Sequence, residues 1–63
     1  MPMTAEQRAQ MLGILSRLDQ CETLAADLKD ESVYADVFVL AEELQEMLVE
    51  MRVRVEHHLD HLS

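Results

Sequence analysis

Three histidines near the end of the chain are the residues best suited to chemistry. His57 and His61 are four residues apart, so on a helix they lie on one face and can chelate a divalent metal ion. The segment lacks the HExxH pattern of zinc proteases, and protonated histidines in a last helical turn also interact favourably with the helix dipole. We therefore expect no metal site and no cofactor. His58 continues an apolar series and could make subunit association depend on pH.

A nucleophilic site is equally poorly supported. The single cysteine, Cys21, is flanked by Asp19 and Glu22, and acidic neighbours disfavour the reactive thiolate. We expect Cys21 to be a small buried hydrophobe. The serines have no histidine at a spacing that suggests a catalytic pair, so we expect that the protein is not an enzyme.

The charge balance narrows the classes of partner. Thirteen acidic residues stand against five basic ones in 63 residues, which gives a formal net charge of −8. Nucleic-acid binding requires a cationic surface, and anionic membranes attract cationic segments, so neither partner is expected. The chain has no run of apolar residues long enough to span a bilayer and no signal-peptide pattern. These features favour a cytoplasmic protein whose partner has a basic surface.

The elements that must position these residues are two helices. Pro2 and Gly13 are the only helix breakers, and Thr4 with Gln7 has the form of a capping box. We predict one domain over residues 1–63, with a helix at about 5–28, a turn at about 29–32 in which Asp30 or Ser32 caps the next helix, and a second helix at about 33–61. A link this short favours an antiparallel helical hairpin.

Gly13 allows two interpretations. It is either a neutral surface glycine or the point at which another helix approaches closely.

Apolar residues recur at steps of three and four along both predicted helices, which is typical of helix packing. The first series is Met11, Ile14, Leu18, Cys21, Ala25 and Leu28. The second is Tyr34, Val37, Ala41, Leu44, Leu48, Met51, Val55, His58 and Leu62. A neighbouring stripe on the second helix contains Val33, Leu40 and Met47.

This apolar surface is more than one partner helix can cover. A chain of this length is marginal as a lone core, and one cysteine cannot form an internal disulfide, so oligomerisation is the remaining source of stability. We predict an all-α fold in which two hairpins dimerise into a four-helix bundle, with parallel and antiparallel pairing both open. The expected dimer interface is Val37, Leu44, Leu48, Met51 and Val55.

A second set of residues is suited to binding another protein. Tyr34 and Phe38, the only aromatic residues, are four residues apart and provide large contact area at low entropic cost. Glu42 and Glu46 belong to an acidic face that can attract a basic partner or simply be solvated. Arg8 can pair with Glu56 or Asp60 across the hairpin, or with a carboxylate of another protein.

Two small families have a similar layout. The length, the hairpin and the polar turn Asp30-Glu31-Ser32 resemble Rop, a plasmid copy-number regulator whose helical-hairpin dimer binds paired RNA loops. The Rop type uses a basic and polar face of its first helix, whereas Arg8, Arg17 and Lys29 here alternate with acidic residues. In size, acidity and two-helix plan the chain also resembles the phage-encoded anti-activators of quorum sensing, which are compact helical dimers that bind a host LuxR-type regulator and block its action on DNA.

These observations predict a homodimeric regulator that inhibits a host protein by occlusion. A DNA-binding activator of the LuxR type is the target that the second resemblance implies. A Rop-like RNA-binding dimer and a structural or assembly subunit of a larger complex are the alternatives.

Overall fold

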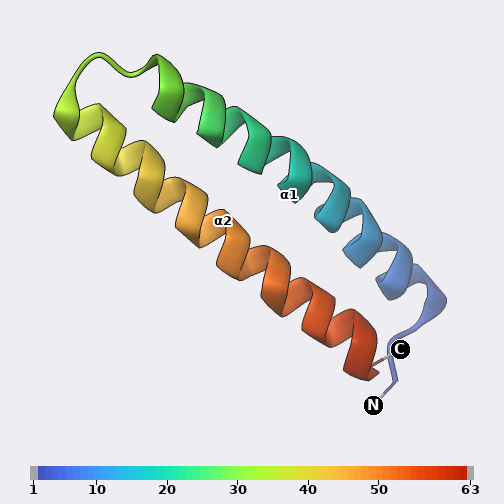
Figure 1. Cartoon of the computed structure of the whole chain (residues 1–63). Helices are drawn as coiled ribbons and strands as arrows, with labels where there is room; N and C mark the ends of the chain where they lie inside the picture. Colours follow the sequence, from blue (N-terminus) through green and yellow to red (C-terminus); the bar gives the residue numbers. More distant parts are fainter. Residues whose placement is uncertain (1, 63) are drawn as a thin grey trace.

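The computed structural model describes residues 2–62, and for residue 62 its backbone alone. Helix α1 spans Ala5–Glu31 and helix α2 spans Ala35–Leu62. They lie side by side in opposite directions, with the turn at one end of the rod and both chain termini at the other (Figure 1). The rod measures 46 × 14 × 11 Å. The predicted all-helical hairpin is thus confirmed, and we call its two ends the turn end and the open end.

The capping box sets the start of α1. The Thr4 hydroxyl accepts a hydrogen bond from the Gln7 backbone N–H at 3.1 Å, and the Gln7 side chain accepts one from the Thr4 N–H at 3.0 Å. Each bond satisfies an amide that would otherwise lack a partner at a helix N-terminus. The predicted start at about residue 5 is confirmed.

The turn lies later than the sequence indicates. Helix α1 continues through Glu31, and the Ser32 hydroxyl donates a hydrogen bond to the Leu28 carbonyl at 2.7 Å. Ser32 therefore satisfies a carbonyl at the end of α1 and does not cap α2, and Asp30 lies inside α1. Lys29 in the last turn favours this extension because a cation suits the negative end of the helix dipole.

The hairpin buries few residues. Leu18, Val55 and Leu59 form its core cluster, with Met3, Met11, Ile14, Leu15 and Leu48 packed against them. Nearer the turn, Ala25 and Ala41 are the buried residues. Among the described residues, the centre of the interface is thus made of large aliphatic side chains toward the open end and of alanines toward the turn end.

In each predicted apolar series, some residues face the other helix and the others face solvent. In α2, Ala41 and Val55 are buried against α1 and Leu48 is half-buried, while Val37, Leu44 and Met51 are 47%, 44% and 51% exposed. In α1, Leu18 and Ala25 are buried, but Cys21 is exposed. The expectation of a buried cysteine is wrong for the hairpin, because alternate members of a heptad series lie about 50° apart around the helix and one neighbouring helix covers only one set. Leu62, the last member of the second series, has a side chain outside the described residues.

Candidate interaction surfaces

One broad side of the hairpin is apolar, and both helices contribute to it. At 100° per residue, the members of each series that do not contact the other helix lie on the same side of the antiparallel pair. We call this surface the apolar face; its residues are Ile14, Cys21, Leu24, Leu28, Val33, Val37, Leu40, Leu44, Met47 and Met51. Leu24, Leu40 and Met47 are each more than 60% exposed. Consistent with this placement, Leu28, Val33 and Val37 line one shallow hollow at the turn end.

Charge is nearly absent from the apolar face. The α1 series 14-17-21-24-28 and the series 33-37-40-44-47-51, which begins in the turn and continues along α2, contain one charged residue, Arg17. Arg17 forms no ion pair with another residue in the described part of the chain. None of the thirteen acidic residues of the chain belongs to either series.

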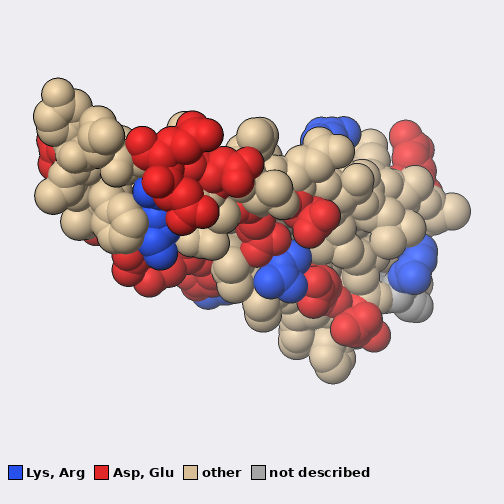
Figure 2. Space-filling model, turned by 45° about the horizontal axis from the view of Figure 1, so that its top comes forward, with Lys and Arg blue, Asp and Glu red and all other residues tan. Residues whose placement is uncertain are grey.

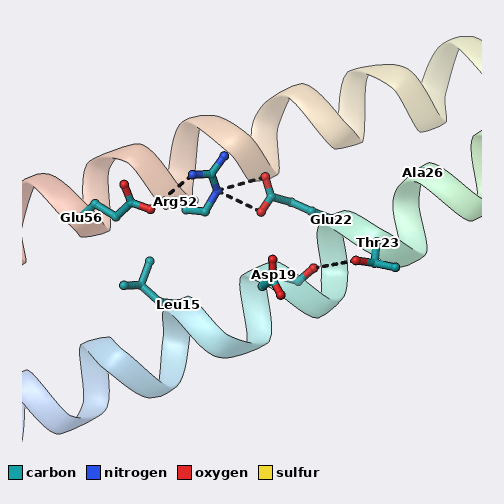
Figure 3. A pocket seen from close by; sticks show the side chains of 7 residues that line it. All are labelled: Leu15, Asp19, Glu22, Thr23, Ala26, Arg52 and Glu56. Atoms are coloured by element: carbon teal, nitrogen blue, oxygen red, sulfur yellow. Dashed lines mark hydrogen bonds and ion pairs between the residues drawn. The ribbon is translucent and has the colours of Figure 1, made fainter.

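The other broad side carries the ion pairs that join the two helices, and we call it the charged face. Arg52 lies between two carboxylates, with its Nε 3.0 Å from Glu22 of α1 and its Nη1 3.2 Å from Glu56 of α2 (Figure 3). Toward the turn, Lys29 Nζ lies 3.6 Å from Glu42 and 5.2 Å from the centre of the Phe38 ring. Figure 2 shows acidic and basic side chains in contact along the rod, with acidic atoms predominating.

Electrostatics around Arg52 favour its charged form. Its hydrogen bond to Glu22, and then that to Glu56, raise the pKa of Arg52 above the ordinary value of a guanidinium. The contribution of Arg52 to stability is fully present below the ordinary guanidinium pKa and is lost only as the pH rises through the raised value, so Arg52 stays charged at physiological pH.

Four of the five predicted partner-binding residues lie in the half of the hairpin nearer the turn, but not on one surface. Tyr34 is 70% exposed and lines the hollow at the turn end with Val37 of the apolar face, whereas Phe38 packs near Lys29. Glu42 and Glu46 line a shallow groove on the charged face together with Lys29. Arg8 is separated from them, because it lies 21 residues before Lys29 on α1, about 30 Å along the helix. Arg8 has no ion pair within residues 2–62, and Glu56 pairs with Arg52 instead.

The predicted dimer residues also separate. Val37, Leu44 and Met51 lie on the apolar face, whereas Val55 belongs to the core cluster and Leu48 packs against it. The rotation of α2 about its axis turns Val55 toward α1, so little of the Val55 side chain remains accessible to a second copy. Leu24 and Leu28 also lie on the apolar face, although neither is among the predicted dimer residues; their spacing from Cys21 could have placed them there.

The histidines form a small exposed cluster at the open end. The His57 and His61 ring centres are 4.3 Å apart, and those of His57 and His58 are 5.9 Å apart. No group of three or more potential metal ligands is found in the part of the chain that the structure describes. Neither described helix is long and apolar enough to cross a bilayer.

Comparison with known proteins adds no family to this description. No protein-family model matches the chain, and no curated protein or solved structure is significantly similar to it.

Proposed function

We propose that this chain is a small acidic regulator that acts as a homodimer and inhibits another protein by covering its working surface. The dimer is a four-helix bundle made by two hairpins that pack through their apolar faces. The observation that carries this proposal is the composition of that face: an apolar surface contributed by both helices and without an acidic residue, in a chain of net charge −8.

The surface area of the hairpin supports a second copy as the occupant of the apolar face. A compact monomer of 7.3 kDa exposes about 4,200 Å². The hairpin exposes 5,007 Å². The excess of about 800 Å² is close to what one partner contributes to a stable interface of standard size.

The charged face then remains available for a different protein. Lys29 and Arg52 are already paired with carboxylates on this face, so its uncompensated charge is negative. Next to that charge, Phe38 provides exposed aromatic surface, and Tyr34 adds to it at the edge of the apolar face near the turn. This combination suits a basic protein surface, since long-range attraction guides the encounter and the aromatic side chains are buried on contact. A cytoplasmic DNA-binding activator of the LuxR type has such a surface and is the target we propose.

The test is the effect of the protein on a LuxR-type activator bound to its promoter fragment, followed by gel shift. The wild type is expected to release the DNA, and Phe38→Ala combined with Glu46→Lys is expected to abolish release. Asp60→Lys makes the same charge change as Glu46→Lys at the open end and should leave release intact. If the wild type leaves the activator–DNA complex unchanged, this target is wrong. Retention of RNA on the immobilised protein at low salt would favour the Rop-like alternative.

A further inference from the structure

The apolar face is not uniform along the rod. Toward the open end, Arg17 interrupts the α1 series and Gln10 continues it beyond Ile14, while Arg54 and His58 continue the α2 series. Because Glu22 lies beside Arg52, Arg17 and Arg54 are at nearly the same height along the rod. Arg54 is paired with Glu50 of its own helix at 2.9 Å, whereas Arg17 has no ion pair within the described residues, so this margin of the apolar face carries a net positive charge.

The margin at the turn end has the opposite charge. Asp30, Glu31 and Asp36 are clustered around the turn, and no basic residue occurs between Lys29 and Arg52. Glu31 lines the same shallow hollow as Leu28 and Val37 of the apolar face. Asp36 is 18 residues before Arg54, which is five full helical turns, so both lie on the same side of α2, about 27 Å apart.

We propose that the second copy packs on the apolar face in the reverse direction, so that each turn end lies over the cationic margin of the other hairpin. The two-fold axis is perpendicular to the rod and passes between α2 and its copy at the height of Leu44. Arg54 of each copy then lies opposite Asp36 of the other, and Arg17 faces the acidic turn of the other copy. This inference rests on the proposed homodimer and specifies its orientation.

Charge complementarity separates this orientation from its alternative. In the reversed arrangement, each end of the apolar contact has two cation–carboxylate contacts, one made by Arg54 and one by Arg17. A two-fold interface is self-complementary, so the same contacts occur at both ends. In the parallel arrangement, with both turns at one end, Arg17 lies near Arg54 of the other copy, and Glu31 lies near Asp36 of the other copy. Like charges at the edge of a partly desolvated interface oppose association.

Charge reversal distinguishes the two orientations. In the reversed dimer, Arg54→Glu places two carboxylates together at both ends, and Asp36→Lys does the same with two cations. Each variant should dimerise about tenfold more weakly than the wild type. An equimolar mixture should instead form mainly the heterodimer, because both of its contacts then join opposite charges. Native mass spectrometry resolves the three species. In the parallel dimer, Arg54→Glu faces Arg17 of the other copy and should strengthen dimerisation.

Cysteine crosslinking gives an independent measurement of the orientation. Val37 lies seven residues of α2 from the two-fold axis near Leu44, so in a reversed dimer the two residues at position 37 are roughly 20 Å apart along the rod. In Val37→Cys with Cys21→Ser, a short bismaleimide should then leave the chains uncrosslinked, whereas Leu44→Cys with Cys21→Ser should crosslink across the axis. Efficient crosslinking of the first variant in its dimeric state would overturn the orientation alone. A wild type that is monomeric by sedimentation would overturn the proposed dimer itself.

Discussion

Single residues at the start of α1 show how local chemistry defines this fold. The Thr4–Gln7 capping box has both of its hydrogen bonds in the structure, so the helix begins where the sequence predicts. Gly13 was open to two interpretations, and the hairpin favours the simpler one. A Cβ on Gly13 would meet only the end of the Arg17 side chain, at 3.9 Å, which is ordinary van der Waals contact. Helix α2 therefore does not require a glycine at this position.

Gly13→Ala is expected to stabilise the protein by about 1 kcal/mol, because alanine loses less backbone entropy in a helix than glycine does. Thermal unfolding should show a Tm increase of about 4–8 °C. Ala9→Gly, at an exposed position of the same helix, is the matched control and should lower Tm by a similar amount. A decrease in Tm for Gly13→Ala would mean that another chain packs closely at this glycine.

At the scale of the helices, one arginine joins elements that are distant in sequence. Arg52 contacts both Glu22, on the other helix, and Glu56, one turn away on its own helix. The Glu22 side chain is 16% exposed and that of Glu56 is 47% exposed. The contact between helices is thus the better shielded of the two, and ion pairs shielded from solvent are less weakened by salt.

Glu22→Gln should therefore lower the Tm more than Glu56→Gln does. The first substitution weakens a tie between α1 and α2, whereas the second removes a pair within one helix, and such pairs contribute little. Thermal denaturation in low and high salt provides the measurement. Salt should reduce the effect of Glu56→Gln proportionally more. Equal effects of the two variants at both salt concentrations would contradict a role of Glu22 in joining the helices.

At the scale of the whole molecule, the hairpin leaves apolar surface exposed. Five apolar residues are buried, whereas fourteen large apolar side chains are exposed among the described residues. Large contiguous apolar patches on a small protein indicate contact with other protein surface. The two broad sides differ in chemistry, which supports separate surfaces for the proposed self-association and for the proposed basic partner.

Leu24→Glu is expected to convert the protein to a monomer, because a carboxylate on the apolar face would be buried without a partner in the dimer. Leu12→Glu is the matched control, since Leu12 is on the same helix and is 49% exposed but lies away from the apolar face. Sedimentation equilibrium should detect a dimer for Leu12→Glu and the wild type, and a monomer for Leu24→Glu. A dimer that tolerates Leu24→Glu as well as Leu12→Glu would show that association uses another surface.

The sequence by itself determined the helical class, the start of α1 and the excess of apolar residues, because capping and periodicity are local properties of the chain. The end of α1 was misplaced by three residues, since Ser32 can hydrogen-bond in either direction and only the folded turn selects the Leu28 carbonyl. Only the tertiary structure decided which half of each apolar series faces the other helix. Ala41 and Val55 face α1 while Leu44 and Met51 do not, because the rotation of α2 about its axis depends on packing along the whole interface. The same rotation placed Glu22 beside Arg52, a pair separated by thirty residues that no local pattern indicates.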